Sequence, residues 1–483
     1  MLDSLILYGA GRRCRTLCKM LQETPIQKVV IVDSSSDKWG SHIEGYPIKP
    51  PISMKEYPNA NLCITIADKD KIGQVRKEIE KTQPGQLKKE ISYCKLLLEL
   101  LKENVIIKKK ILGQKEKKEK EINIIFDCVN GLGLGGVETW TMSLCEAMIK
   151  AGKENIFIVS DAGKYQVPHS IASHILYTEI DHKEYLSIES VKNVVDVLRK
   201  KLPCKVITCM PDEVMVAAYI LKYYYPDMVE VISVIHNSGE HLYNGYMGFR
   251  ECTDLYIAVS RDIREEMIKK GVSPDRIESM TCPFVCEETL KRSYTEKGQE
   301  PIRIGYAGRM DGMEHSQKRM DLLLKLIMQL EEKEILFEME LAGDGSVKEE
   351  MEIEIKAHKL TKKVRFLGKL PHEEIPAFWK CQDICINLAD YEGRSISIME
   401  AMGNGAIPVV TDTSGVKEDI ENGINGYIVP LGDYQAAAER IEYLAKNRQQ
   451  LRQMGELAHQ VMYPKSQMGT HLKFWESILN YGG

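Results

Sequence analysis

The stretch from residue 384 to residue 430 constrains the fold most, because apolar runs alternate in it with a loop and a short helix. Residues 384–388 are an apolar run typical of a buried parallel strand, and residues 406–410 form a second such run. Between them the sequence predicts a loop and a helix that begins at Ser395 or Ser397. In this order the elements cross over right-handed, and the loop opens at the carboxyl end of a parallel sheet. We therefore predict an α/β protein with a ligand site at this loop.

Two glutamates stand in this stretch, Glu392 in the loop and Glu400 in the helix. A glutamate in the loop can accept hydrogen bonds from sugar hydroxyls, and a glutamate one turn into the helix can reach the diol of a ribose. The free N–H groups at the start of the helix can donate hydrogen bonds to a diphosphate. The alternative is structural: Ser397 and Glu400 would form a capping box, and Glu392 would be a surface charge that favours the helix dipole.

A longer signature surrounds these glutamates. Residues 391–402 read Y-E-G-R-S-I-S-I-M-E-A-M, and P-V-V at 408–410 and N-G-Y-I-V-P at 425–430 follow. Together they resemble the donor-site signature of glycosyltransferase family 4, whose members are retaining enzymes with the GT-B fold. The family pattern often has Phe-Gly where this chain has Arg394 and Ser395. We expect this difference to bear on which sugar is bound.

The resemblance covers about residues 121–483 and implies a GT-B fold, two Rossmann-like domains that face a cleft. Residues 121–295 would form the acceptor-side domain. A glycine-rich turn with Gly135 and Gly136 matches the family's G-G-x-E motif, and the alternative is a tight strand-to-helix connection without a ligand. A later strand ends at His236, which the resemblance places near the donor sugar. Outside the family, a lone histidine at a strand end is more often a satisfied polar group.

Residues 296–462 would form the domain that binds the nucleotide-sugar donor. Arg309 follows a strand, and Lys318 stands near the start of the next helix. By position they match the family's diphosphate-binding pair, and such cations stabilise charge that develops on a leaving group. Gly343 ends another strand and is expected to approach the nucleotide. Residues 463–483 are predicted to form a helix that crosses back to the first half.

Residues 1–98 open with a strand, a glycine turn at Gly9 and Gly11, a helix, a second strand and then Asp33. This is the order of a dinucleotide-binding fingerprint, although Cys14 replaces its third glycine. The segment also resembles small Rossmann-like modules found with bacterial polysaccharide enzymes. We therefore predict an N-terminal Rossmann-like accessory domain, with a nucleotide site at Gly9, Gly11 and Asp33 as a further hypothesis.

Residues 99–120 are rich in lysine, and Lys and Glu alternate from 115 to 120. This charge pattern predicts a linker, either a solvent-exposed helix or a flexible tether. Basic residues are also attracted to anionic lipid, so peripheral contact with the cytoplasmic membrane is a second interpretation.

The composition argues against several classes of protein. The formal net charge is −5, so no global positive field favours nucleic acid. No apolar run reaches the length of a membrane span, and the N-terminus lacks a signal-peptide pattern. The thirteen cysteines, including the pair Cys282 and Cys286, lack the spacing of a disulfide framework or a zinc site and are assigned to packing. We therefore expect no metal and a cytoplasmic protein, with the inner face of the membrane as a second location.

The resemblance implies a retaining glycosyltransferase that moves a sugar from a UDP- or GDP-sugar to an acceptor hydroxyl and requires no cofactor. The implied setting is bacterial surface polysaccharide or glycoconjugate synthesis, with a saccharide, a lipid-linked or a protein-linked acceptor. Two alternatives stay open: a nucleotide-sugar epimerase of the same architecture and a non-catalytic nucleotide-sugar-binding scaffold. The predicted catalytic residues are Glu392, His236, Arg309 and Lys318. The predicted donor-binding residues are Gly135, Gly136, Arg309, Lys318, Gly343, Glu392, Gly393, Arg394, Ser395 and Glu400.

Overall fold

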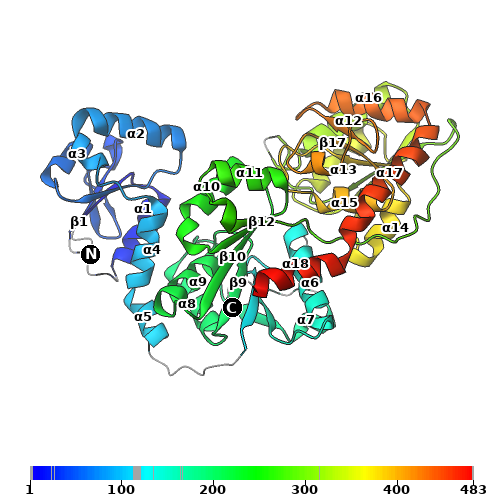
Figure 1. Cartoon of the computed structure of the whole chain (residues 1–483). Helices are drawn as coiled ribbons and strands as arrows, with labels where there is room; N and C mark the ends of the chain where they lie inside the picture. The colour runs from blue at the N-terminus through cyan, green and yellow to red at the C-terminus, as the bar shows by residue number, and fades with distance from the viewer. Residues whose placement is uncertain are drawn as a thin grey trace. The chain divides into compact units, whose positions relative to one another are not determined.

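The computed structural model describes residues 4–480 except 23, 25, 27, 113–120, 134, 164, 166 and 315. Within this part the chain forms three sheets with helices packed around them (Figure 1). Most paired strands run parallel, because successive strands are connected by helices that return the chain to the same end of the sheet. The predicted α/β class is therefore confirmed.

The N-terminal sheet is built from β1 (Ser4–Tyr8), β2 (Lys28–Val32), β3 (His42–Ile43), β4 (Tyr46–Lys49) and β5 (Asn61–Ile64). Their order is β3-β4-β2-β1-β5, and β3 pairs antiparallel with β4. The apolar runs of β1 and β2 are buried on both faces, as expected for central parallel strands. The accompanying helices are α1 (Arg12–Leu21), α2 (Lys69–Thr82), α3 (Pro84–Leu87), α4 (Tyr93–Glu103) and α5 (Val105–Leu112), with 3-10 turns η1 (Ser36–Lys38) and η2 (Pro51–Glu56).

The second sheet is built from β6 (Asn123–Cys128), β7 (Ile156–Asp161), β8 (Ile175–Thr178), β9 (Cys204–Thr208), β10 (Val229–Ile235), β11 (Leu255–Ala258) and β12 (Ile277–Ser279). Their order is β12-β11-β10-β9-β6-β7-β8. The accompanying helices are α6 (Gly136–Lys150), α7 (His169–Ala172), α8 (Ile188–Arg199), α9 (Glu213–Tyr224), α10 (Glu240–Gly248) and α11 (Arg261–Lys269), with 3-10 turns η3 (Arg250–Cys252) and η4 (Pro274–Arg276).

The first part of the segment predicted as a linker, residues 99–112, belongs to helices that pack against the second sheet's helices. Helices α4 and α5 contact α9 and α8, respectively. Leu100, Leu101, Ile107 and Ile111 are fully or almost fully buried. Residues 99–112 therefore differ from the predicted exposed helix or tether, because their apolar side chains find partners on α8 and α9. The alternating Lys and Glu residues of 115–120 lie outside the described residues.

The third sheet is built from β13 (Ile302–Ala307), β14 (Phe337–Ala342), β15 (Val364–Gly368), β16 (Ile384–Asn387), β17 (Ile407–Thr411) and β18 (Tyr427–Val429). Their order is β15-β14-β13-β16-β17-β18. The accompanying helices are α12 (Met320–Glu332), α13 (Lys348–Ala357), α14 (Ile375–Lys380), α15 (Ile396–Gly403), α16 (Tyr434–Lys446), α17 (Gln449–Ser466) and α18 (Met468–Asn480), with 3-10 turns η5 (His372–Glu374) and η6 (Val416–Glu418).

The core of the third sheet is made by apolar side chains of its strands and covering helices. Ile304, Met339, Ile386 and Val409 are almost fully buried, and Leu326 of α12 packs in the same cluster. Burial of a side chain of this size contributes about 1.5–3 kcal/mol, so this core gives the sheet a rigid frame. The loops at the carboxyl ends of its strands are held by that frame.

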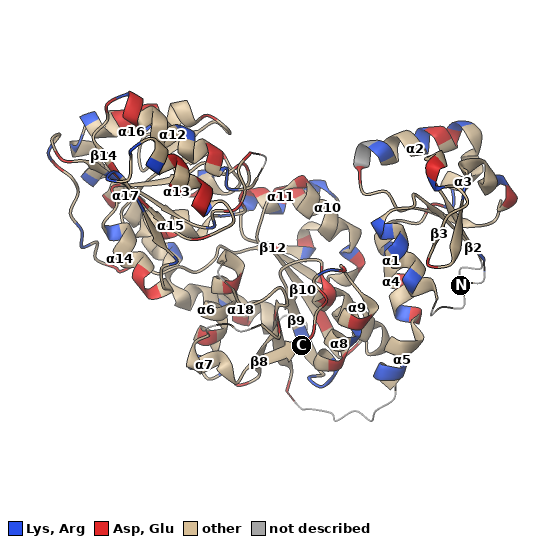
Figure 2. Cartoon of the chain, turned by 180° about the vertical axis from the view of Figure 1, so that it is seen from behind, with Lys and Arg blue, Asp and Glu red and all other residues tan. Residues whose placement is uncertain are grey.

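The chain divides into two compact units. The first comprises Met1–Leu132, Asn155–Ser233 and Asn244–Asp254, and the second comprises Gly133–Glu154, Val234–Tyr243 and Leu255–Gly483. Figure 2 shows Lys and Arg interspersed with Asp and Glu along helices such as α2 and α16. Within the second unit, the segment predicted as a C-terminal helix contains the end of α17 and then α18. Trp475 of α18 lies 5.8 Å from Trp140 of α6 between ring centroids.

Candidate active site

The candidate site lies in the second unit, where the strand order of the third sheet reverses between β13 and β16. At such a point the connections from neighbouring strands leave toward opposite faces, which opens a crevice at their carboxyl ends. Strand β13 leads to Arg309, and β16 leads to the loop 388–395. Both segments line one cavity, so the tertiary structure brings these two predicted donor-binding segments together.

The strand, loop, helix and strand predicted for residues 384–410 are present as β16, a loop, α15 and β17. Helix α15 begins after Ser395, whose side chain makes no capping hydrogen bond. The Glu400 carboxyl is buried, and its Oε1 lies 3.9 Å from Nδ1 of His372. The alternative of a capping box between Ser397 and Glu400 is therefore wrong. The first N–H groups of α15 have no intrahelical acceptor and can bind an anion.

Glu392 is buried in the loop before α15 and is held from several sides. Its carboxylate forms an ion pair with Lys318, and only 9% of the Glu392 side chain and 13% of the Lys318 side chain are exposed. Nε2 of Gln317 donates to the same carboxylate at 3.5 Å. The Ser238 hydroxyl donates to the backbone oxygen of Glu392. A ligand hydroxyl that reaches this carboxylate therefore meets a charge that is already oriented.

Gly393 brings this loop against the residues that follow β10. A Cβ atom on Gly393 would lie 2.6 Å from the carbonyl carbon of His236 and 2.8 Å from Cα of Asn237. Both are backbone atoms, so neither can turn aside as a flexible side chain can. The position therefore requires glycine, and its close packing places His236 beside the loop.

His236 follows directly after β10 and is partly buried. Its Nδ1 lies 3.8 Å from Sγ of Cys282, and its ring meets Trp140 edge-on at 4.6 Å between centroids. Burial lowers the pKa of His236 to about 3, so the imidazole is neutral at physiological pH. A neutral imidazole can donate through one nitrogen and accept through the other, which suits a sugar hydroxyl.

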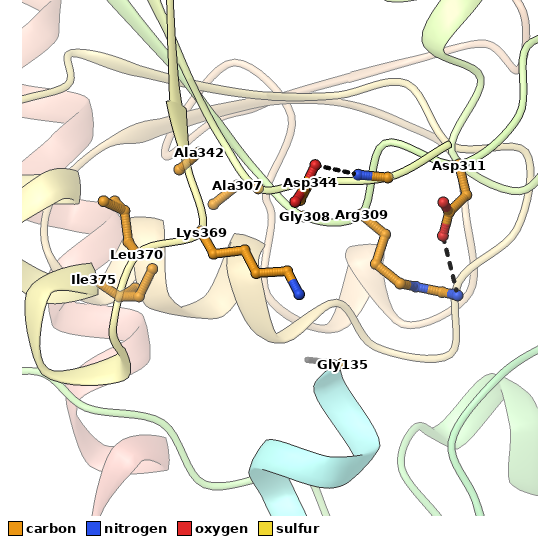
Figure 3. Close-up of a pocket in the computed structure, with 12 residues that line it drawn as sticks. Gly135, Ala307, Gly308, Arg309, Asp311, Ala342, Asp344, Lys369, Leu370 and Ile375 are labelled. Atoms are coloured by element: carbon orange, nitrogen blue, oxygen red, sulfur yellow. Dashed lines mark hydrogen bonds and ion pairs between the residues drawn. The ribbon is translucent and has the colours of Figure 1, made fainter. Parts of the chain in front are cut away.

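The larger of the two cavities at this crevice has a volume of about 560 Å³. Arg309 lies at its edge, 54% exposed and 3.6 Å from Asp311. Figure 3 shows the Lys369 side chain extending into this space and the Arg309 guanidinium turned toward Asp311. The cavity is lined by Gly135, Ala307, Gly308, Arg309, Asp311, Ala342, Gly343, Asp344, Gly345, Lys369, Leu370 and Ile375.

Gly343 allows the strand ends at this cavity to approach closely. Its φ is +138°, and an added Cβ atom would lie 3.0 Å from the carbonyl carbon of Gly308. A side chain here would strain the backbone and push the two strand ends apart. The predicted contact of Gly343 with a nucleotide stays a prediction, and the structure places the residue on the wall of the cavity.

A smaller cavity of about 200 Å³ shares Ala307, Gly308 and Arg309 with the larger one, so the two adjoin. Its wall carries predicted residues from three parts of the second unit. The lining residues are Gly136, Val137, His236, Asn237, Cys282, Ala307, Gly308, Arg309, Gln317, Lys318, Glu392, Arg394, Ser395, Ile396 and Ser397.

The glycine-rich turn before α6 contributes Gly135 and Gly136 to these cavities. Glu138, the acid of the G-G-x-E motif, folds back over the turn, so that a Cβ on Gly135 would lie 3.0 Å from its Cδ. Burial raises the pKa of Glu138, and the positive Arg309 opposes that rise. The motif therefore lies at the same crevice as Arg309.

Arg394 lines the smaller cavity, but its guanidinium is bound elsewhere. Nε and Nη2 donate to the carboxylate of Asp419 at 2.9 and 2.5 Å, and Nη1 lies 3.4 Å from Glu418. Lys465 near the end of α17 also donates to Asp419, at 2.6 Å. The guanidinium of Arg394 is therefore paired with acids behind the loop, and the predicted contact with the donor stays a prediction.

Glu400 lies apart from the Lys318 and Glu392 pair, near the loop that follows β15. Burial raises the pKa of Glu400 to about 8, so its carboxyl keeps a proton over much of the physiological range. His372 of η5 is its titratable neighbour across 3.9 Å, and burial lowers the pKa of His372, which favours the neutral imidazole. A carboxyl in this state can donate one hydrogen bond and accept others, as a pair of ribose hydroxyls requires.

The predicted N-terminal nucleotide residues lie in the first unit, in the N-terminal sheet. Asp33 accepts hydrogen bonds from the N–H of Ala10 at 2.6 Å and of Ser35 at 2.8 Å, and it pairs with Lys38 at 3.2 Å. Burial opposes ionisation, but these three partners together lower the pKa of Asp33. Asp33 thus ties the turn at Gly9 and Gly11 to the end of β2, and the nucleotide site there stays a prediction.

Sequence reasoning missed Lys369, His372 and Cys282. Lys369 follows the glycine that ends β15, so its signal was a cation directly after a strand end. His372 carried no local signal, because its relation to Glu400 depends on the tertiary structure. Cys282 was assigned to packing, and it also lines the smaller cavity.

Among the described residues no group of three or more His, Cys, Asp or Glu side chains is arranged to hold a metal ion. In the same part of the chain, none of the helices has the length and apolar character needed to cross a membrane.

Residues 288–461 match the protein family described as Glycosyl transferases group 1. The chain is 26% identical to the amylovoran biosynthesis glycosyltransferase AmsK of Erwinia amylovora over 191 residues, 38% of this chain and 46% of that protein. It is 22% identical to the N-acetyl-alpha-D-glucosaminyl L-malate synthase of Bacillus anthracis over 278 residues, 54% of this chain and 71% of that protein. The match thus covers about half the length of AmsK.

Solved structures show the same architecture. The crystal structure of Anabaena HepE in complex with UDP and glucose superimposes with a TM-score of 0.59 at 16% identity. The match covers 74% of this chain and 100% of that chain. At this identity the likeness shows the fold alone.

Proposed function

We propose that the protein transfers a sugar from a nucleoside diphosphate to an acceptor hydroxyl. Residues 288–461 form a glycosyltransferase group 1 domain, and the chain has the GT-B fold with an additional N-terminal sheet. One observation carries the proposal: Arg309, Lys318, Glu392 and the uncapped start of α15 surround two adjoining cavities. Cations and free N–H groups suit a diphosphate, and a carboxylate suits sugar hydroxyls.

The diphosphate is assigned to Arg309, Lys318 and the first N–H groups of α15. Arg309 is half exposed, and its guanidinium, which contacts Asp311 and donates to Oε1 of Gln317 at 3.3 Å, can turn its fork toward a phosphate. When the bond between the sugar and the diphosphate breaks, negative charge grows on the leaving oxygen. Positive groups already placed around that oxygen stabilise the transition state more than the ground state, which accelerates transfer. Lys369 adds a further cation at the larger cavity.

The sugar is assigned to the smaller cavity, between Glu392 and His236. Glu392 accepts from hydroxyls, and the neutral His236 supplies an uncharged partner. Lys318 is shared between Glu392 and the diphosphate, so it joins the two ends of the donor. The ribose is assigned to Glu400, whose buried carboxyl can pair with a diol.

Transfer with retention is part of the proposal, supported by the resemblance of residues 391–402 to the donor-site signature of a retaining family. The acceptor oxygen forms a bond to the anomeric carbon while the bond from that carbon to the diphosphate breaks. The departing diphosphate oxygen takes the acceptor proton, so the reaction needs no second carboxylate of the glycosidase type. Gly135 and Gly136 line the acceptor side of the cavities in this arrangement.

UDP is the leaving group that we place first, because HepE was crystallised with UDP and glucose, and GDP is second. The name of AmsK, an amylovoran biosynthesis glycosyltransferase, supports a biosynthetic role for the transfer. We propose surface polysaccharide or glycoconjugate synthesis as the setting, with a saccharide, a lipid-linked or a protein-linked acceptor. All thirteen cysteines are free, in keeping with the reducing cytoplasm as the site of action. Contact with the inner face of the membrane is part of the same proposal.

The experiment is a thermal-shift panel of UDP-, GDP- and ADP-sugars and NAD on the wild type, Lys318→Ala and Lys446→Ala. Lys446 is a matched control, since it is a surface lysine that pairs only along α16 among the described residues. A donor at a hundred times its Kd stabilises the folded state by about 2.7 kcal/mol. We expect one sugar nucleotide to raise the Tm of the wild type and of Lys446→Ala, and to have little effect on Lys318→Ala.

Other outcomes would redirect the assignment. A shift with NAD alone would contradict the proposal and move attention to Gly9, Gly11 and Asp33. Binding followed by conversion of the donor sugar to its epimer, without an acceptor, would replace transfer by epimerisation. Binding of a sugar nucleotide without turnover with any acceptor tested would support the alternative of a non-catalytic nucleotide-sugar-binding scaffold.

A further inference from the structure

The imidazole of His236 meets two side chains within the second unit, and the backbone of the same residue is packed against a loop. Trp140 meets it edge-on with the ring planes at 67°. Sγ of Cys282 lies 3.8 Å from Nδ1, and Gly393 lets the loop before α15 pack against the His236 backbone. The orientation of the ring is therefore set by its neighbours. What it can offer a ligand depends on which nitrogen carries the proton.

The second ring nitrogen, Nε2, is shielded from solvent and has no hydrogen-bond partner among the described residues. A buried polar atom without a partner costs about 1–3 kcal/mol, so it marks a place that a ligand or a water can satisfy. His236 and Cys282 both line the smaller cavity, as do Glu392 and Lys318. This is the cavity to which the proposed function assigns the donor sugar.

Burial sets the protonation of both partners. It keeps the pKa of His236 near 3 and raises the pKa of Cys282 to about 12, so a neutral imidazole faces a thiol that keeps its hydrogen. The positive Arg394 acts on Cys282 in the opposite sense to burial. A cation attracts the lone pairs of sulfur and repels the hydrogen, which favours an S–H bond directed away from the guanidinium. The thiol is a donor, and an unprotonated Nδ1 is an acceptor.

We propose that Cys282 is a positioning residue for the donor sugar: its S–H donates to Nδ1 of His236, which fixes the tautomer with hydrogen on Nε2 and offers that N–H to a sugar oxygen. Only the last step rests on the proposed function, because the contact between Cys282 and His236 does not depend on a sugar. Cys282 acts through His236 and does not itself touch the reacting atoms.

The tautomer is measured directly by ¹⁵N NMR of the histidine side chains in the full-length protein. The variants are Cys282→Ala, Cys282→Ser and the control Cys286→Ala, and His236→Ala identifies the signals of His236. Cys286 lies four residues further along, and its thiol donates to Ser466 at 3.2 Å. Serine keeps an O–H donor at position 282, so it serves as the conservative variant if alanine disturbs folding.

We expect wild type, Cys282→Ser and Cys286→Ala to show His236 with hydrogen on Nε2. Cys282→Ala should show a mixture of the two tautomers. An unchanged His236 in Cys282→Ala, or hydrogen on Nδ1 in the wild type, would overturn the proposal. Neither result depends on whether the protein binds a nucleotide sugar.

Ligand affinity tests the last step. Cys282→Ala should weaken binding of the UDP-sugar by about 2- to 10-fold, the range of one hydrogen bond, and leave the Kd of UDP unchanged. Cys282→Ser should restore most of the loss. In the His236→Ala background, Cys282→Ala should have no further effect, because the cysteine acts through the histidine. A general packing defect would weaken UDP and the UDP-sugar alike and would count against the proposal.

The two proposals fail in different ways. If the wild type binds no nucleotide sugar, the proposed function and the sugar step are both overturned, whatever the NMR result. If the wild type binds the UDP-sugar but Cys282→Ala leaves its Kd and the His236 tautomer unchanged, only the role of Cys282 is overturned.

Discussion

Gly393→Ala is the substitution that tests most directly whether the loop before α15 builds the site. The added Cβ atom would lie 2.6 Å from the carbonyl carbon of His236 and 2.8 Å from Cα of Asn237. Carbon atoms in ordinary contact are about 3.5 Å apart, so the loop would retreat by about 0.9 Å. Glu392 precedes this residue and would move with it.

The size of the effect follows from that displacement. A misplacement of about 1 Å at a reacting centre costs about 100-fold in rate, and overpacking costs about 1–3 kcal/mol of stability. The assay is the initial rate of UDP release with the donor identified by the thermal-shift panel. We expect kcat/KM to fall about 100-fold in Gly393→Ala while the protein remains folded.

Gly298→Ala is the control, because a Cβ atom on Gly298 would meet nothing within 4 Å. It should behave as the wild type in both rate and Tm. If Gly393→Ala keeps kcat/KM within about threefold of the wild type, the close packing of the loop does not hold the reacting groups in place. Equal losses in both variants would refute the role of the close packing.

Three further perturbations test other parts of the site. Burial raises the pKa of Glu400 to about 8. Between about pH 4.5 and pH 8 the unfolded chain gives up this proton while the folded chain keeps it, so the wild type should lose up to about 5 kcal/mol of stability as the pH rises through this range. Glu400→Gln should remove this loss in urea denaturation at pH 5 and pH 8, and a variant with the same pH dependence as the wild type would contradict the assignment. Lys369→Ala should weaken UDP binding about 3- to 10-fold at low salt, with little effect on uridine, and calorimetry that finds the two ligands equally affected would exclude a phosphate contact. Asp419→Asn should destabilise the protein by up to about 3–5 kcal/mol in denaturant titrations, because it leaves the buried Arg394 with Glu418 as its remaining acid, and a change below about 1 kcal/mol would show that the pair is replaceable.

Local sequence patterns were enough to predict the elements around the site. The apolar runs of β16 and β17 and the loop and helix between them were found within about one residue of their observed bounds. Such elements depend on side-chain periodicity and on residues a few positions apart, which a sequence displays directly. The strand that ends before Arg309 and the turn at Gly135 were found in the same way.

The neighbours of each predicted residue could not be found in this way. The ion pair between Lys318 and Glu392 joins residues 74 positions apart in the chain. The sequence shows that Arg394 differs from the family pattern. Its hydrogen bonds to Asp419 could not be predicted, because they depend on η6 packing behind the loop. The sequence placed Leu100 and Leu101 in a charged linker. In the structure their helix α4 packs against α9, a contact that the local sequence does not display.

The sequence by itself determined the α/β class, the glycosyltransferase signature and the kinds of side chain available to bind a donor, because each of these is written in short runs of residues. Only the tertiary structure decided which of those side chains share a cavity, which charge is already paired and which nitrogen of His236 meets Cys282. The physical reason is that charge pairing, burial and proton position depend on atoms within a few ångströms in space, and these come from strands and loops far apart in the chain.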